Sequence, residues 1–507
     1  MPTDLAAVSG LLVLPGLAAL YRLLEGRRAW WWCYLAGAVH MGVFSWSLRH
    51  LLFAAWLGIA LVGGGYFAVL PLWVRGLAGW RLPRPLAFGL AVAGASWLRA
   101  FMPEISYPHA QPSHALYLWP RLLSGPVGLG GEPLANLLLA TFAAAVYEAS
   151  RARGRGLRGL LAVGLAWAAC AAIAAWSSVG PAARASRPGG QVEVAAVQPG
   201  PIPWTSLADF AAWQEQRLLE PTRALGRDDA PPPLVLWPES ASFVDVEPGT
   251  GGGPARAVLA DEWRVRAPLP LARATRLLLG GRLVGGPHHG VAAAILLDGS
   301  GSLLGYQQKV RLVPGGERQP FLGWLPDSWS TALQRGLAQA IGAAPHLEPA
   351  PPRPPLVLDE RVTVGALLCY DNAYADVARG YVEAGANLLV VLSNEMWYQG
   401  GAELEQMVAM SVFRALETGV PVLRCTIDGE TVLVGPDGRI GPRLARTVPG
   451  VLRLSVDVPG GTGPVAPAAP VVALVCALSL VFGIAHALAA WVRLRQPFAG
   501  DRSPGGG

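Results

Sequence analysis

Residues 362–374 read VTVGALLCYDNAY, a run of strand-forming apolar residues that ends at a cysteine, Cys369. Two other segments follow the same pattern: LVLWPES carries Glu239, and YQQKVRLVPGGE carries Lys309. Nearly continuous apolar runs of this length are typical of strands that are buried on both faces. We therefore predict that Glu239 and Cys369 project from one edge of a sheet, where sites in such folds form.

Each of these side chains has an ordinary explanation on its own, because cysteine is often buried, glutamate suits a helix N-terminus and lysine suits a solvated loop. Their combination is more specific. Lys309 is the only lysine in a chain that otherwise uses arginine, which favours a position that needs a compact ammonium. We expect Glu239 to take the thiol proton, Cys369 to attack a carbonyl and form an acyl thioester, and Lys309 with the next backbone N–H to stabilise the oxyanion. The ammonium is also expected to lower the pKa of the thiol.

The composition places part of the chain in lipid. Of 507 residues, 52% are hydrophobic and 15% are charged, with a mean hydropathy of +0.37, which is too apolar for an ordinary soluble protein. The net charge of +6 comes from scattered arginines, which favours anionic lipid headgroups over nucleic acid as a partner. A membrane-spanning helix needs roughly 20 apolar residues. Apolar runs that predict such helices lie at residues 5–21, 29–48, 51–74, 85–101, 133–147, 159–176 and 469–491.

Arginines gather in alternate connections between these runs, which indicates the orientation of the chain. The arginines concerned are Arg22, Arg27, Arg28, Arg75, Arg81, Arg84, Arg151, Arg153, Arg155, Arg158, Arg493 and Arg495. Because positively charged loops stay in the cytoplasm, the N-terminus and the large polar domain are predicted on the outer side. The loop at residues 102–132 then faces outward too, either as an interfacial anchor or as a substrate contact.

The polar domain is bracketed by Pro/Gly-rich linkers at residues 181–190 and 459–470, and its size suits a single domain. Its strand-like runs are separated by helix-period stretches, notably residues 207–220, which Pro221 should end, and residues 403–418. Sheets this apolar are covered by helices, so we predict an α/β layered domain. The five cysteines form no CxxC or Cys/His pattern, so we infer no structural disulfide, no metal and no cofactor.

The order Glu, Lys, Cys with WPES, LVP-G-GE, LCY and SNEMWY resembles the nitrilase superfamily, whose domain is an αββα sandwich. The membrane flanks and the run EQMVAMSVFRALETGVPVLRCTIDGETVLVGPDGRI resemble one branch, the bacterial apolipoprotein N-acyltransferases. The resemblance implies that an acyl chain passes from a phospholipid, through a thioester on Cys369, to the α-amine of a diacylglyceryl-cysteine at a lipoprotein N-terminus. It also implies a multi-pass protein of the bacterial inner membrane whose catalytic domain is periplasmic, and we expect a monomer.

By motif, Glu239, Lys309 and Cys369 match the catalytic triad of that branch. Residues that match its substrate-binding or supporting positions are Glu317, Tyr370, Asp371, Trp397 and Tyr398. Several neighbours depart from the pattern: Asp371 replaces Glu, Gly315 replaces Phe, Gln307 replaces Tyr, Ala292 replaces Asn and Met407 replaces His. The branch also has eight spans with a cytoplasmic N-terminus, whereas this chain predicts seven.

These observations predict four regions. They are a membrane domain of about six helices at residues 1–180, a nitrilase-like domain at 190–459, a linker with a final helix at 460–493, and a cytoplasmic tail at 494–507. Two other functions stay open: a membrane-anchored amidase or hydrolase that passes the acyl group to water, and a weakened paralogue that only binds lipid or lipoprotein. Seven helices exceed what an anchor needs, and the complete triad disfavours the paralogue.

Overall fold

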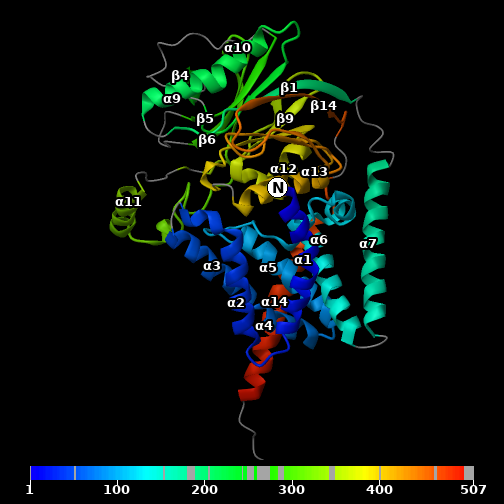
Figure 1. The fold of residues 1–507 in the computed structure, drawn as a ribbon. Coiled ribbons are helices and arrows are strands. Elements are labelled where there is room, and N and C mark those ends of the chain that lie inside the picture. The colour runs from blue at the N-terminus through cyan, green and yellow to red at the C-terminus, as the bar shows by residue number, and fades with distance from the viewer. Residues whose placement is uncertain are drawn as a thin grey trace, which may run out of the picture.

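The computed structural model describes residues 2–50, 53–151, 155–179, 189–203, 206–241, 244–247, 256–259, 274–283, 291–341, 347, 349–398, 401–461 and 465–495. Figure 1 shows a bundle of helices, built from the N-terminal part of the chain and the last helix, with an α/β domain at one end.

Within the described residues all seven apolar runs form helices, and the second ends in a short 3₁₀ helix, η1 (Trp46–His50). The third is divided into two helices, and the fifth begins at Pro120, so the loop predicted for residues 102–132 is wrong from that point on. Proline suits the first turn of a helix, and the added segment bends at Gly131, whose φ of 67° is one that glycine tolerates. The helices of the bundle are α1 (Pro2–Leu23), α2 (Ala29–Phe44), α3 (Phe53–Ala68), α4 (Leu70–Gly79), α5 (Arg84–Phe101), α6 (Pro120–Arg151), α7 (Arg155–Val179) and α14 (Ala469–Arg495).

The bundle is a membrane domain. Among the described residues, three helical stretches are long and apolar enough to cross a bilayer: Phe53–Gly79, Pro120–Arg151 and Ala469–Ala489. Large apolar side chains on the outside of the bundle are exposed, including Leu11 at 71% and Leu165 at 70%. An apolar outer surface of this kind is stable against hydrocarbon rather than water.

The arginine-rich turns lie at the end of the bundle that is remote from the α/β domain. Arg151 at the end of α6 pairs with Glu25 after α1 at 2.9 Å, so two of these turns meet. In Figure 1, α1 begins beside the α/β domain and runs away from it, and α14 leaves the domain in the same direction. The arginine-rich turns and the α/β domain therefore lie at opposite ends of the bundle.

The α/β domain contains two mixed sheets. The larger sheet has the order β14-β1-β2-β5-β3-β4, with β6 paired to β5 and β7 paired to β6; the smaller has the order β13-β12-β11-β10-β9-β8. The strands of the larger sheet are β1 (Gly190–Gln198), β2 (Leu234–Trp237), β3 (Val244–Glu247), β4 (Arg256–Leu259), β5 (Arg276–Leu283), β6 (Val291–Leu297), β7 (Leu303–Gln308) and β14 (Gly450–Val458). Those of the smaller sheet are β8 (Leu356–Val357), β9 (Thr363–Leu368), β10 (Leu388–Ser393), β11 (Val422–Thr426), β12 (Val432–Val434) and β13 (Ile440–Arg443).

The two sheets pack face to face. Leu236 and Leu278 of the larger sheet share one buried cluster with Leu368, Val390 and Leu423 of the smaller sheet. In β1, β9 and β10 every second residue contributes to this cluster, because side chains alternate between the faces of a sheet.

Helices cover the outer faces of both sheets. Trp213 and Leu225, from α9 (Leu207–Gln214) and α10 (Glu220–Gly226), pack on the larger sheet. The smaller sheet is covered by α12 (Ala375–Glu383) and α13 (Ala402–Thr418). The predicted αββα sandwich is confirmed.

The structure corrects one helix boundary and adds elements. Pro221 does not end the helix that starts at Leu207, since it lies in the first turn of α10, where no N–H is needed, after a π-helical turn at Glu215–Leu219. The short strands β3, β4 and β8 and the helices α11 (Asp327–Ile341) and α12 were not predicted, whereas β7 is the strand expected before Lys309. Most of the predicted linker at 181–190 and of the tail at 494–507 lies outside the described residues.

The bundle and the sandwich share a core. Tyr117, Leu123 and Val127 from the membrane domain belong to the same buried cluster as Tyr370 and Phe413 from the α/β domain. Figure 1 shows α12 and α13 between the smaller sheet and the bundle. The helices that cover the sheet on one side thus contact the membrane domain on the other.

Candidate active site

The three residues singled out by the sequence lie just beyond three strand ends. Glu239 follows β2, Lys309 follows β7 and Cys369 follows β9. Since β2 and β7 belong to the larger sheet and β9 to the smaller, the prediction that Glu239 and Cys369 project from one edge of a single sheet is wrong. They meet instead across the sandwich, because the face-to-face packing brings the ends of β2 and β9 together.

Lys309 lies between two carboxylates. Its Nζ donates to Glu239 Oε1 at 2.9 Å and to Glu317 Oε1 at 2.6 Å, and the side chain of Lys309 is fully buried. Glu239 also accepts the backbone N–H of Asn394 at 3.4 Å. A buried ammonium is tolerated where opposite charges compensate its lost hydration.

The electrostatics of the site keep the thiol protonated. Burial raises the pKa of Cys369, and the negative charge of Glu239 adds to this effect, while Lys309 opposes it. The expected influence of Lys309 is present, but burial outweighs it. Burial also raises the pKa of Glu239, against the attraction of Lys309. For Lys309, burial alone would lower the pKa, yet Glu239 and Glu317 together hold it well above its ordinary value.

The backbone at Cys369 is held in an uncommon conformation. Cys369 has a φ of 47°, in the left-handed region that few non-glycine residues adopt. Directly after it, the Asp371 carboxylate accepts the N–H of Arg311 at 2.7 Å and that of Leu368 at 3.3 Å. Burial raises the pKa of Asp371 to about 7, against the charge of Lys309. Asp371, which is shorter than the glutamate of the family, therefore links the turn at Cys369 to the segment after Lys309 through these hydrogen bonds.

Gln307, one of the departures noted in the sequence, connects the two sheets. It is fully buried; its Oε1 accepts the N–H of Ala366 in β9 at 2.6 Å, and its Nε2 donates to Pro354 O at 3.1 Å. Gly280 in β5 packs against the backbone of Glu239. A Cβ at this position would lie 2.5 Å from the Cα of Glu239, which leaves no room for a side chain. Both residues fix the strand ends that carry the three candidate groups.

The LVPGGE loop is held from the membrane domain. Glu317 Oε2 accepts the N–H of Val313 at 2.9 Å, and Gly315 takes a φ of 80°, a conformation that favours glycine over the family's phenylalanine. Glu104, in the loop after α5, pairs with Arg318 and accepts the N–H of Phe321 at 3.0 Å. No sequence pattern pointed to Glu104.

The remaining predicted residues differ in their placement. Tyr370 is buried and donates its hydroxyl to Ser106 O at 3.0 Å. Tyr398 is buried, whereas Trp397 is 48% exposed. The charge of Cys369 contributes to the raised pKa of Tyr398, after burial, so this phenol is near the thiol. Among the described residues, Trp397 makes no hydrogen bond or ring contact with Glu239, Lys309 or Cys369.

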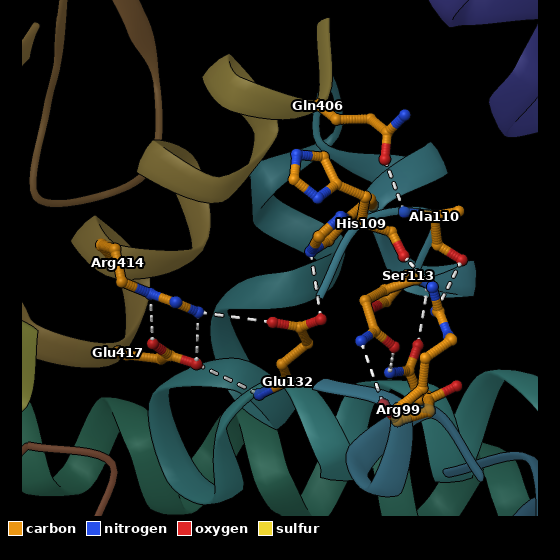
Figure 2. Close-up of polar contacts among 12 residues, drawn as sticks. Arg99, His109, Ala110, Ser113, Glu132, Gln406, Arg414 and Glu417 are labelled. Atoms are coloured by element: carbon orange, nitrogen blue, oxygen red, sulfur yellow. Dashed lines mark hydrogen bonds and ion pairs between the residues drawn. The ribbon is translucent and has the colours of Figure 1, made fainter. Parts of the chain in front are cut away.

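A loop of the membrane domain reaches the site. Figure 2 shows Arg99 donating to the backbone carbonyls of His109 and Ala110, while Gln406 of α13 accepts the N–H of Ala110. The ring of His109 stacks on Tyr370, with centroids 5.8 Å apart. Burial lowers the pKa of His109 to about 3, so its imidazole is neutral. The loop, predicted as either an anchor or a substrate contact, packs on the residue that follows Cys369.

A second buried network joins α13 to the bundle. In Figure 2, Arg414 extends toward Glu132 of α6 at 3.4 Å and Glu417 at 2.8 Å. Glu132 also lies 3.1 Å from His114, and Arg414 donates to the carbonyl of Asn372 at 3.4 Å. Arg414 thereby connects the membrane domain to the short helix η6 (Cys369–Ala373), which the sequence alone did not indicate.

Comparisons with known proteins agree with this architecture. Residues 193–460 match the family described as carbon-nitrogen hydrolase. The chain is 30% identical to the apolipoprotein N-acyltransferase of Azotobacter vinelandii, over 85% of this chain and 82% of that protein. It is 27% identical to the enzyme of the same name from Caulobacter vibrioides, again over 85% and 82% of the two chains. A third, from Brucella melitensis, is 28% identical over 83% of this chain and 76% of the relative.

The chain belongs to the carbon-nitrogen hydrolase family, whose model matches the residues of the αββα sandwich. Within this family it belongs with the apolipoprotein N-acyltransferases, and its function is the N-acylation of lipoproteins at a membrane.

Proposed function

We propose that the protein transfers an acyl chain from a phospholipid to Cys369 and then to the α-amine of a diacylglyceryl-cysteine at the N-terminus of a lipoprotein. Glu239, Lys309 and Cys369 are the catalytic triad of this reaction. The observation that carries the proposal is the buried Lys309 ammonium, which two carboxylates hold beside the thiol.

In the first half of the reaction, Glu239 takes the thiol proton as the sulfur attacks the ester carbonyl. This base is needed because the buried thiol is neutral. The tetrahedral oxyanion is stabilised by the Lys309 ammonium and the N–H of Tyr370. When the ester C–O bond breaks, Glu239 returns the proton to the lysophospholipid alkoxide, and the acyl chain remains on Cys369 as a thioester.

In the second half, the lipoprotein amine attacks the thioester carbonyl and gives a proton to Glu239. The same two donors stabilise the new oxyanion. The C–S bond breaks, the thiolate regains its proton, and an amide has formed. The two substrates occupy the site in turn, so ping-pong kinetics are expected.

The proposal includes a location. The protein is placed in the bacterial inner membrane as a multi-pass monomer with a periplasmic catalytic domain, and the boundaries at residues 180, 190, 459 and 493 separate its parts. Support comes from the arginine-rich turns, which lie at the opposite end of the bundle from the sandwich. A site next to the outer leaflet avoids moving an acyl chain into water, at about 0.8 kcal/mol per CH₂.

The test is to incubate the purified protein with phospholipid and to look for a hydroxylamine-sensitive acyl adduct by mass spectrometry. The adduct is expected on Cys369 and is expected to be absent from Cys369→Ala. An adduct that persists in that variant would contradict the mechanism. Addition of a diacylated lipopeptide then separates a transferase from a hydrolase, since only the transferase yields the triacylated product.

A further inference from the structure

Ser393, the last residue of β10, carries a buried hydroxyl that is not part of the triad. The residue is 1% exposed, and its Oγ makes no hydrogen bond of full geometry within the described part of the chain. A buried hydroxyl without a partner costs free energy, because it gives up its hydrogen bonds to water. An alanine at the end of the run LLVVLS would avoid this cost. The hydroxyl therefore points to a neighbouring group that uses it.

The register of the smaller sheet places Ser393 beside Cys369. The strands β10 and β9 are parallel, and the last residues paired between them are Leu392 and Leu368. Ser393 and Cys369 directly follow these two residues, so they are lateral neighbours at the ends of adjacent strands. Adjacent strands lie about 4.8 Å apart, a distance that two short polar side chains can bridge. The hydroxyl is therefore next to the nucleophile.

The neighbour of Ser393 on the other side is Thr426 of β11, which is paired with it in the ladder. The hydroxyl of Thr426 lies 3.4 Å from that of Thr431, and the hydroxyl of Thr431 also accepts the N–H of Thr426 at 3.1 Å. Thr426 is thus engaged with Thr431. Of the two lateral neighbours, this leaves the sulfur of Cys369 as the partner for the Ser393 hydroxyl.

The acidity of the thiol reflects this neighbour. Burial raises the pKa of Cys369, and the charges of Glu239 and Glu317 add to the effect. Lys309 lowers the same pKa, and so does a hydrogen bond from the Ser393 hydroxyl. A donor lowers the pKa of a thiol because it bonds to the ionised form, the thiolate. Hydroxyl hydrogens rotate, and catalytic hydrogen bonds often align only as charge develops, so the resting geometry suits a donor that engages during the reaction.

The segment that carries Ser393 is fixed at the site. The next residue, Asn394, donates its N–H to Glu239 at 3.4 Å. Glu395 follows and pairs with Arg424, and both of these side chains are buried. Ser393 therefore lies between the nucleophile and the base, on a backbone whose position is set before a substrate binds.

We propose that Ser393 is a further catalytic residue, whose O–H donates to the sulfur of Cys369 whenever that sulfur carries negative charge. This inference rests on the proposed thioester chemistry. The thiol proton passes to Glu239 as the sulfur attacks the ester, and the sulfur regains a proton after the C–S bond breaks, while Ser393 keeps its own proton throughout. Lys309 and the N–H of Tyr370 stabilise the oxygen of the tetrahedral intermediate, whereas Ser393 stabilises the sulfur.

The first test needs no acyl donor. In Glu239→Gln the base is absent, so the rate at which iodoacetamide alkylates Cys369 at a fixed pH depends on the ionised fraction of the thiol; mass spectrometry of the Cys369 peptide gives this rate. Adding Ser393→Ala should reduce the thiolate about tenfold, since a hydrogen bond to a charged group contributes roughly this factor. A more basic thiolate is roughly threefold more reactive, so the net rate should fall about threefold.

Thr426→Val in the same background is the matched control. It removes a buried hydroxyl from the adjacent strand, at the position of the ladder that is paired with Ser393, and it should change the rate by less than about twofold. Equal alkylation rates with and without Ser393→Ala would overturn the inference. So would an equal fall in Thr426→Val, because it would indicate a general effect on the strand ends. Iodoacetamide takes the place of the lipid, so this result does not depend on acyl transfer.

The second test follows both half-reactions with the base intact. Formation of the acyl-enzyme from phospholipid and its consumption by a diacylated lipopeptide are each measured in a single turnover. Charge develops on the sulfur in both, so Ser393→Ala should slow each by about tenfold, with Tm unchanged. A loss confined to one half-reaction would overturn the inference, because it would assign Ser393 to one substrate rather than to the sulfur. Absence of acylation in the wild-type protein contradicts the proposed function instead.

Discussion

Removing the guanidinium of Arg414 is expected to destabilise the protein strongly. The side chains of Arg414 and Glu417 are fully buried, and that of Glu132 is 14% exposed. Arg414→Met keeps the length and apolar character of the side chain, but it leaves both carboxylates without this partner. Glu132 retains His114 at 3.1 Å, whereas the hydrogen bond that Glu417 retains, among the described residues, is the one from the N–H of Glu132 at 3.2 Å.

The magnitude follows from the burial of these charges. Breaking a buried ion pair by removing one partner costs about 3–5 kcal/mol, because an uncompensated charge remains. For a domain of this size, each kcal/mol corresponds to about 2 °C or more in Tm. Arg414→Met should therefore lower Tm by about 6 °C or more. The double variant Arg414→Met/Glu417→Gln should recover part of this loss, since it also removes the charge of the buried Glu417 carboxylate that the first change leaves without its cation.

The assay is thermal unfolding of the full chain in detergent or nanodiscs, with Arg439→Met as the control. Arg439 also pairs with a carboxylate, Asp437 at 3.1 Å, but both side chains are more than half exposed, so the control should shift Tm by little. If Arg414→Met lowers Tm no more than Arg439→Met, or if the double variant is less stable than Arg414→Met, the account of the network is wrong.

Two further predictions concern the site. Acylation of Cys369 requires ionised Glu239, whose pKa is raised by burial; the rate should therefore increase with pH over a range above that of an ordinary glutamate, and a rate that is flat from pH 4 to 8 would count against Glu239 as the base. Gln307→Leu removes both hydrogen bonds to Ala366 and Pro354 and should cost about 1–3 kcal/mol in the free energy of unfolding, because it leaves a buried N–H and a carbonyl without partners. Its Tm is the measurement, and an unchanged Tm would contradict the bridging role.

Much of the fold could be predicted from the sequence, because its strongest signals are long. The apolar runs of the helices and of β2 and β9 are continuous, and the structure has helices and strands there, although the third helical run is divided in two. Short elements escaped notice, since β8 has two residues and β3 and β4 have four each, too few for a pattern. The error at Pro221 came from applying the rule for helix interiors to a proline in a first turn.

The site was predicted in its residues but not in its geometry. Strand ends identify Glu239, Lys309 and Cys369, yet the sequence does not say which sheet each strand joins, so the meeting of two sheets could not be seen. For the same reason, contacts between segments that are distant in the sequence could not be predicted. Glu104 and Arg318 are far apart in the chain, and only the folded structure brings them together.

The shared core between bundle and sandwich bears on how the enzyme can be divided. A fragment cut at residue 189 would keep Glu239, Lys309 and Cys369 but lose Arg99, Tyr107 and the apolar cover that Tyr117 gives to α13. Its newly bared helical face would drive self-association in water. Solubility and chemistry are coupled in this chain. An attempt to obtain a water-soluble catalyst must therefore redesign the face of α12 and α13 that contacts the bundle, rather than shorten the sequence.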